Sequence, residues 1–249
     1  MRSTIVGSLI ACAALVTPAA GQNAPAAPAS GRTLVAAAKL PAIGDAPVHF
    51  RAVSLTLPPG SSSSVSATDG IIYEVSGTTT VSIGGEVKTL IPGEGAFIPN
   101  GAAATLKAGD AGPSVCMHFL LGSAMDLEKV TASAPAVVKT LYRTAAPLPG
   151  LTPGAHDLNL ARITFPAQTP SNRPHHRTGA ALYYVVSGTG ANTIEGRTED
   201  KAPGSFIYER SGLVHQWGSP GSEPFTFLVF NINREGVPAV VAEAPPKTQ

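Results

Sequence analysis

The sequence predicts an all-β protein that contains the same domain twice. Three observations support this prediction. The 249 residues include 26 glycines and 23 prolines, which interrupt helices and limit the length of regular segments. Between these breaks lie short runs of apolar and β-branched residues that partly alternate with polar ones, as strands with one buried face do. Finally, several sequence features recur at a constant spacing of 111 residues, which indicates a duplicated domain.

The repeat is visible in short segments of the sequence. "VSG" at 75–77 returns at 186–188, and "PGEGAFIP" from residue 92 corresponds to "PGSFIYER" from residue 203. Single residues at the same spacing are Arg51 and Arg162, Tyr73 and Tyr184, and Gly101 and Gly212. Because the spacing stays constant over about fifty residues, we predict no insertion between the copies. We place the N-terminal domain at 32–145 and the C-terminal domain at 146–249.

Each copy reads as a series of strands in the same order. The first strands are "FRAVSLTL" at 50–57 and "LNLARITF" at 158–165, followed by "GIIYEVSG" at 70–77 and "ALYYVVSG" at 181–188. Their hairpin partners are "TTTVSIGG" at 78–85 and "GANTIEG" at 190–196, and the closing strands are "SVCMHFLL" at 114–121 and "PFTFLVFNI" at 224–232. Short strands joined by tight turns predict two barrels or sandwiches. We expect one short helix, in "AMDLEKVTA" at 124–132.

The N-terminus has the features of a secretory signal peptide. "MRST" is a short positively charged start, "IVGSLIACAALV" is an apolar run too short to span a bilayer, and "TPAAGQ" supplies small residues for cleavage. We therefore assign 1–21 to a signal peptide and 22–31 to a disordered Ala/Pro linker, and we expect a secreted or periplasmic protein. "LIAC", ending at Cys12, resembles a lipoprotein cleavage site, which leaves a lipid anchor as the alternative.

The composition argues against several classes of function. The formal charge is +1 and 13% of the residues are charged, without a cluster of Lys and Arg, so we expect no binding to nucleic acid. We also expect no transmembrane segment. Once the signal peptide is removed, Cys116 is the only cysteine, which excludes an intramolecular disulfide and a thiolate-rich metal site. Cys116 lies in an apolar strand, where we expect a buried core residue.

A motif in the second copy resembles a known protein family. The pattern P-G-x5-P-x-G-x2-H-x3-N is matched at Pro203, Gly204, Gly212 and His215, and is changed at Arg210 and Ser219. This pattern is similar to the second motif of the cupin superfamily. The resemblance extends over both copies and implies two tandem cupin barrels, which have a double-stranded β-helix or jelly-roll fold. It also implies association into a homodimer.

The first cupin motif, G-x5-H-x-H-x3–4-E-x6-G, is only partly present. Its glutamate position falls on Ala181, which cannot bind a metal. One register places His175 and Arg177 on the two histidine positions, and the other places Pro174 and His176 there. Because successive residues of a strand point to opposite faces, His175 and His176 cannot both face the barrel interior without a bulge. The family pattern P-H-x-H-x-G favours the first register.

Two functions follow from these residues, and the sequence leaves both open. In the first, His215 with His175 or His176 binds a divalent transition metal, namely Zn, Fe, Ni or Mn, in an oxygenase- or isomerase-type enzyme for a small organic substrate. In the second, no metal is bound and Arg177 holds a small anionic or sugar ligand, because a guanidinium repels a divalent ion and suits carboxylates. A structural, oligomeric protein is a third interpretation. The substrate-binding residues that we expect are Arg177, Trp217 and Tyr183.

The first copy lacks the groups that define this candidate site. Ala104 stands where the second copy has His215, Gly70 stands at the glutamate position, and serines 61–64 replace the histidine segment. We therefore expect the first barrel to be structural. In the second copy, Glu209 lies beside the second motif and is able to replace the missing carboxylate, although an ion pair with Arg210 is an equally good prediction.

Overall fold

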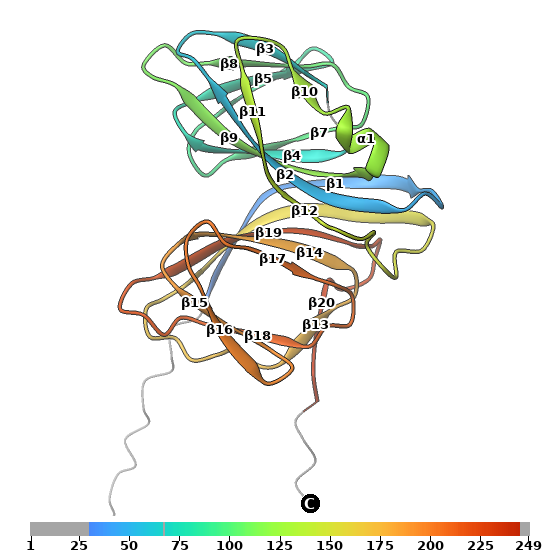
Figure 1. Cartoon of the computed structure of the whole chain (residues 1–249), viewed down its shortest axis with the longest axis vertical. Helices are drawn as coiled ribbons and strands as arrows, with labels where there is room; N and C mark the ends of the chain where they lie inside the picture. Colours follow the sequence, from blue (N-terminus) through green and yellow to red (C-terminus); the bar gives the residue numbers. More distant parts are fainter. Residues whose placement is uncertain (1–29, 67, 245–249) are drawn as a thin grey trace, which may run out of the picture.

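The computed structural model describes residues 30–66 and 68–244, and within these ranges it contains twenty strands and one short helix. Figure 1 shows two barrels packed against each other, one drawn mainly in blue to green and the other in yellow to red. The all-β fold of two tandem barrels is therefore confirmed. The helix expected in 124–132 forms at Ala124–Glu128 as α1, where Ser123 caps its N-terminus. In the described ranges, no helix is long and apolar enough to cross a membrane.

The first barrel consists of two five-stranded antiparallel sheets. In order, one sheet contains β11 (Val137–Arg143), β2 (Val48–Leu57), β9 (Ser114–Ser123), β4 (Gly70–Ser76) and β7 (Gly95–Ile98). The other contains β10 (Thr131–Ala132), β3 (Ser62–Ser66), β8 (Ala104–Ala108), β5 (Thr79–Ile83) and β6 (Glu86–Leu90). Cys116 is buried inside this barrel, as predicted.

The second barrel repeats the same strand order. One sheet contains β1 (Gly31–Ile43), β12 (Gly154–Phe165), β19 (Phe225–Arg234), β14 (Ala180–Ser187) and β17 (Phe206–Glu209). The other contains β16 (Arg197–Lys201), β15 (Gly190–Ile194), β18 (His215–Gly218), β13 (His175–Arg177) and β20 (Val240–Ala242). By position in the sheets, each strand has a counterpart in the first barrel, and β1 corresponds to β11.

The position of β1 differs from the domain limits that the sequence predicts. We placed residues from 32 onward in the first barrel, but β1 pairs with β12 of the second barrel over most of its length. Pairing covers the open edge of β12 and buries Leu40 and Ile43 between the barrels, which explains this position. Gly31, which we assigned to the linker, already belongs to β1. The predicted signal peptide at 1–21 lies outside the described residues, as does most of the linker.

The constant spacing of 111 residues holds from β4 to β9 but not for the strands before β4. Leu57 is paired with Ser114 and Phe165 with Phe225, so β2 and β12 correspond at a spacing of 108 residues. Arg51 and Arg162 are therefore not equivalent, contrary to our prediction. The connection from β12 to β13 is longer than the one from β2 to β3, and it absorbs the difference.

The recurring "VSG" has a local cause. Gly77 and Gly188 have φ angles of +84° and +70°, which side chains other than glycine rarely adopt. A Cβ atom there would lie 2.5 Å from the Pro113 carbonyl oxygen in one barrel and 2.3 Å from the Pro224 carbonyl oxygen in the other. Each glycine thus allows a tight turn between two strands that passes close to a neighbouring backbone.

Three apolar clusters stabilise the molecule, one inside each barrel and one between the barrels. The cluster between the barrels joins Phe50 and Phe119 of the first barrel to Phe230 of the second, with ring centroids 5.3 and 5.7 Å apart. Successive side chains of β14 point to opposite faces of its sheet, so they belong in turn to the cluster between the barrels and to the cluster inside the second barrel. Tyr183 faces the interior of the second barrel and Tyr184 faces the first barrel.

Candidate functional site

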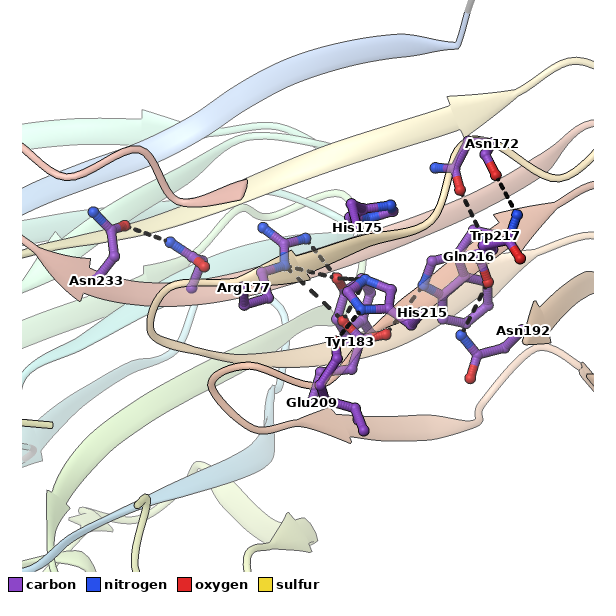
Figure 2. A network of polar contacts seen from close by, with 12 residues as sticks. Asn172, His175, Arg177, Tyr183, Asn192, Glu209, His215, Gln216, Trp217 and Asn233 are labelled. Carbon is purple, nitrogen blue, oxygen red and sulfur yellow. Dashed lines mark hydrogen bonds and ion pairs between the residues drawn. The ribbon is translucent and has the colours of Figure 1, made fainter. Parts of the chain in front are cut away.

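Five large side chains with polar atoms meet inside the second barrel, and each is less than one-tenth exposed. They are Arg177 from β13, Tyr183 from β14, Glu209 from β17, and His215 and Trp217 from β18. Figure 2 shows these side chains pointing toward one another, with His175 next to His215. The structure therefore brings His215 of the second cupin motif together with His175 and Arg177, which stand at the histidine positions of the first.

The three residues of β13 alternate, and this decides between the two registers. Arg177 is buried in the site, and the ring of His175 lies 4.2 Å from the ring of His215, centroid to centroid. His176, which we proposed as a possible metal ligand, is directed elsewhere. Its Nδ1 atom lies 2.5 Å from Oε1 of Glu243, just after the C-terminal strand β20. Strand alternation gives His175 and Arg177 one face and His176 the other, so His176 is not part of the site.

Glu209 supplies the carboxylate that the first motif lacks. It is fully buried, and it is paired with Ala181 on the adjacent strand, so both residues face the barrel interior. One oxygen, Oε1, accepts a hydrogen bond of 3.2 Å from the Trp217 indole. The other, Oε2, lies 2.9 Å from Nε2 of His215, but this contact does not have hydrogen-bond geometry and leaves Oε2 without a donor. No ion pair between Glu209 and Arg210 forms.

The two histidines of the site present the same ring nitrogen. Nδ1 of His215 lies 3.0 Å from the Leu213 carbonyl oxygen, and Nδ1 of His175 lies 2.8 Å from the Arg173 carbonyl oxygen. A carbonyl oxygen only accepts, so each Nδ1 carries the proton and a neutral ring has its lone pair on Nε2. Burial, followed by the charges of His215 and Arg177, lowers the pKa of His175, which favours its neutral form.

Arg177 occupies a position where the cupin motif has a histidine, and it is held by Tyr183. Its Nε and Nη2 atoms donate to the Tyr183 hydroxyl at 3.0 and 2.5 Å. Burial raises the pKa of Tyr183 well above 10, so the hydroxyl remains neutral. Arg177 Nε is also 4.0 Å from Oε2 of Glu209, which places a permanent cation beside the carboxylate. The same hydroxyl lies 3.5 Å from Nε2 of His215.

The donor atoms suit a divalent transition metal in chemistry, although they do not form a complete cage. Nε2 of His215 and Oε2 of Glu209 are 2.9 Å apart, and neither has a short hydrogen bond. Imidazole nitrogen and carboxylate oxygen are ligands for these ions, and His175 adds a second imidazole nearby. Among the described residues, no three His, Cys, Asp or Glu side chains stand as a ready metal-binding group. A metal would therefore be held by His215 and Glu209, with His175 as the adjacent third donor.

The equivalent region of the first barrel is apolar. Ile98, Ala104, Leu106 and Ile72 take the places of Glu209, His215, Trp217 and Tyr183, and all four are buried. Val65, which is paired with Ala104, takes the place of His175, which is paired with His215. The predicted difference between the copies is thus visible as a polar site in one barrel and apolar side chains at the same positions in the other, although the first barrel buries Glu74 and His118 at other positions.

A cavity of about 520 Å³ lies over β1, β12 and β19 of the second barrel. It is lined by Arg32 of β1, Asp157 and Asn159 of β12, Asn233 of β19 and Val237 of the following loop. Asn233 is connected to the barrel interior through a hydrogen bond of 2.8 Å from the Asn231 amide. The cavity is therefore bordered by Asn233, whose hydrogen-bond partner Asn231 is buried in the barrel.

Two buried polar residues of the second barrel, one in the site and one beside the cavity, were not fully predicted from the sequence. Glu209 was one of two equal alternatives, because its cross-strand partner Ala181 is distant in the sequence. Asn231 was missed altogether. A signal for it exists in "FLVFNINRE", where two asparagines interrupt a strand that is otherwise apolar.

Comparison with known proteins agrees with the fold. A family model of the cupin domain matches residues 161–231, which run from β12 to β19. Oxalate decarboxylase from Bacillus subtilis superposes with a TM-score of 0.55 and 15% identity, over 78% of this chain and 71% of that chain. Salicylate 1,2-dioxygenase from Pseudaminobacter salicylatoxidans gives 0.51 and 13%, over 73% and 70%. No curated protein matches the sequence.

At these identities the structural likeness defines the fold alone. The matched domain lies in the second barrel, and the neighbours align with most of both barrels. Residues 161–231 thus match a cupin domain, and the chain has two tandem barrels with the same strand order.

Proposed function

We propose that the second barrel is a metal-dependent cupin centre that acts on a small organic substrate, and that the first barrel is structural. The observation that carries this proposal is the pair formed by Oε2 of Glu209 and Nε2 of His215. The two atoms are buried and 2.9 Å apart, without hydrogen-bond geometry between them. Both atoms are electron-rich when His215 is neutral, and Arg177, 4.0 Å from Oε2, offsets the charge without donating a hydrogen bond to that oxygen. A metal ion bound by both atoms would relieve their repulsion.

The backbone around the histidines supports this proposal. Histidines that bind metals usually donate their other ring N–H to a carbonyl or carboxylate, which fixes the ring and leaves one nitrogen for the ion. His215 and His175 both make such a bond through Nδ1. Among the structural neighbours, oxalate decarboxylase is described with Mn(II) centres, and it shares the barrel fold. One divalent transition ion per chain is the expected cofactor.

Arg177 is the substrate-binding group in this proposal. A bound divalent metal acts as a Lewis acid that polarises a substrate oxygen. The guanidinium uses two of its N–H groups on Tyr183, and its remaining N–H groups suit a carboxylate or another anion. The cavity lined by Asn159 and Asn233 is the approach that we propose for the substrate. An oxygenase- or isomerase-type reaction on a small acid is the class we favour.

The proposal is tested by elemental analysis of the mature protein, purified without a histidine tag. About one metal ion per chain is expected in the wild type, and none in His215→Ala or Glu209→Gln. His118→Leu, which changes a buried histidine of the first barrel, is the matched control and should keep the metal. Wild-type protein that stays metal-free after incubation with Mn, Fe, Ni and Zn salts would contradict the proposal.

The alternative is a metal-free barrel that binds a small anion, and the buried guanidinium of Arg177 is the observation in its favour. Carboxylates should then raise the melting temperature of metal-free protein, because a ligand that binds only the native state stabilises it. Arg177→Met should abolish this rise. If the site binds a metal instead, carboxylates should stabilise the protein only after the ion is added.

We also propose that the protein is exported, because its first residues have the pattern of a signal peptide. Mass spectrometry of the protein from its native host should show a mature N-terminus close to residue 22. Lipid attached to Cys12 would indicate the anchored alternative instead.

A further inference from the structure

A second buried oxygen near the site has no hydrogen-bond partner. Asn231 lies on β19, is 1% exposed, and its Oδ1 atom has no donor. The residues that alternate with it, Val229 and Phe227, belong to the interior cluster of the second barrel, so Asn231 faces the same interior. A buried amide oxygen without a partner is destabilising, and such atoms in native proteins usually have a ligand, an ion or a water.

The orientation of this amide is fixed by its neighbour. Nδ2 of Asn233 donates to two backbone carbonyls, those of Arg234 at 3.0 Å and Val237 at 2.9 Å. Oδ1 of Asn233 must therefore face Asn231, where it accepts an N–H at 2.8 Å. Asn231 has to present its Nδ2 to Asn233, so its Oδ1 is directed elsewhere into the barrel. Figure 2 shows Asn233 on the other side of Arg177 from His215 in that view.

The strand register places Asn231 and Glu209 on either side of one small residue. Ala181 of β14 is paired with Glu209 of β17 on one side and with Asn231 of β19 on the other. Residues that are directly opposite on neighbouring strands point to the same face of a sheet. The side chain of Ala181 is only a methyl group, so it supplies no donor atom between its two longer neighbours. Ala181 is also the position where the cupin motif has its glutamate.

We infer that Asn231 and Glu209 together replace the carboxylate missing from Ala181, so that the metal proposed above is bound by two oxygens from the flanking strands and by Nε2 of His215. This inference rests on the proposed function. Mixed nitrogen and oxygen donors without a thiolate suit Mn²⁺, Fe²⁺ or Zn²⁺ rather than soft ions such as Cu⁺.

The first barrel provides an internal comparison for this inference. Its counterpart of Ala181 is Gly70, which is paired with Ile98 and Leu120 in the same register. Both polar partners are thus absent together in that barrel, and Ala104 replaces His215 there. If Asn231 served only the fold of a cupin barrel, the first barrel would need a similar amide.

The test is a titration of metal-free protein with Mn²⁺ alone, followed by calorimetry and by the fluorescence of Trp217, the only tryptophan. Asn231→Leu introduces the residue of the first barrel, and it should weaken the Kd for Mn²⁺ by at least about tenfold. Asn231→Asp keeps the oxygen and adds a charge, so it should bind Mn²⁺ more tightly than the wild type. Asn192→Val is the matched control, because it also replaces a buried asparagine of the second barrel with its first-barrel counterpart, Val81.

The outcomes separate this inference from the proposed function. If the wild type binds Mn²⁺ and Asn231→Leu binds it equally well, the inference is wrong and the proposed function stands. Equal losses in Asn231→Leu and Asn192→Val would point to a general loosening of the barrel and also overturn the inference. If Asn231→Leu does not fold, the Asn231→Asp variant decides, because an unchanged Kd contradicts direct binding. Wild-type protein that binds none of the tested ions overturns both proposals.

Discussion

Each barrel buries one glutamate completely, and the two glutamates differ in how their oxygens are used. In the first barrel, both oxygens of Glu74 accept hydrogen bonds, from the Ser114 hydroxyl at 2.9 Å and from the Cys116 thiol at 3.1 Å. Burial raises the pKa of Cys116 to about 12, so the thiol keeps the proton that it donates. This carboxylate is satisfied by groups of its own barrel, and it is structural.

In the second barrel, Glu209 has only one of its oxygens satisfied. The other faces His215 and lies 4.0 Å from Arg177, which balances its charge without a direct hydrogen bond. The two glutamates are not copies of one ancestral residue, because the counterpart of Glu209 is Ile98 and the counterpart of Glu74 is Val185. Burial of a carboxylate is therefore no sign of function by itself. What distinguishes the second barrel is an oxygen that is left open.

The largest effect on stability is expected from Glu209→Ile. This substitution gives the second barrel the residue that the first barrel has at the equivalent position, Ile98. Arg177 would then be buried without a negatively charged partner, and breaking a buried pair on one side typically costs about 3–5 kcal/mol. We expect a decrease of that size in the free energy of unfolding, measured by urea denaturation with Trp217 fluorescence, which reports on the second barrel. The double variant Glu209→Ile/Arg177→Met should recover much of the loss. A decrease below about 1 kcal/mol in the single variant would show that the two charges are not coupled.

His118→Leu in the first barrel is expected to have a smaller effect, and it should increase the free energy of unfolding instead of lowering it. His118 is fully buried, and both of its ring nitrogens lack hydrogen-bond partners. Removing an unsatisfied buried polar group while keeping a similar volume should stabilise the protein by about 1–3 kcal/mol. The measurement is urea denaturation followed by circular dichroism, which reports on both barrels.

The same histidine predicts a pH dependence. Burial lowers the pKa of His118 from 6.5 to about 3, so the unfolded chain binds a proton that the folded chain does not. Stability from this group is therefore complete above pH 6.5 and falls by about 1.4 kcal/mol per pH unit as the pH decreases toward 3. His118→Leu should remove this contribution, so the advantage of the variant over the wild type should be larger at pH 5 than at pH 7 and should continue to grow toward pH 3. An identical pH profile for both proteins would contradict the assignment.

The sequence was sufficient for the fold but not for every part of it. Glycine turns, alternating apolar residues and the internal repeat predicted two barrels, because these features depend on local geometry. The exchange of β1 into the second barrel was not predictable in this way. Its residues have the pattern of a strand wherever they pair, and the choice of β12 depends on which edge is open. The change in the spacing between the copies, from 111 residues to 108 for β2 and β12, could not be seen in the sequence. Arg51 and Arg162 match by chance at the spacing of 111.

For the candidate site, the sequence identified the residues that carry a motif. His175, Arg177 and His215 lie together, and alternation correctly separated them from His176. The sequence could not single out Glu209 and Asn231 as candidate ligands. Both are paired with Ala181, but from strands that are distant from it in the chain. A motif search examines the strand that lost its carboxylate, whereas the barrel places candidate replacements on the strands beside it.

The smallest effect on stability is expected from the ion pair between Lys39 of β1 and Glu235, just after β19 of the second barrel. Lys39 and Glu235 are 2.5 Å apart, but their side chains are 75% and 43% exposed, and exposed pairs contribute little to stability. Lys39→Ala should therefore leave the urea midpoint of the second barrel unchanged, in low and in high salt. The adjacent residue gives the contrast, because Leu40 is 4% exposed and Leu40→Ala should cost about 2–4 kcal/mol. If Lys39→Ala destabilised the barrel as much as Leu40→Ala, the attachment of β1 would depend on charge rather than on burial.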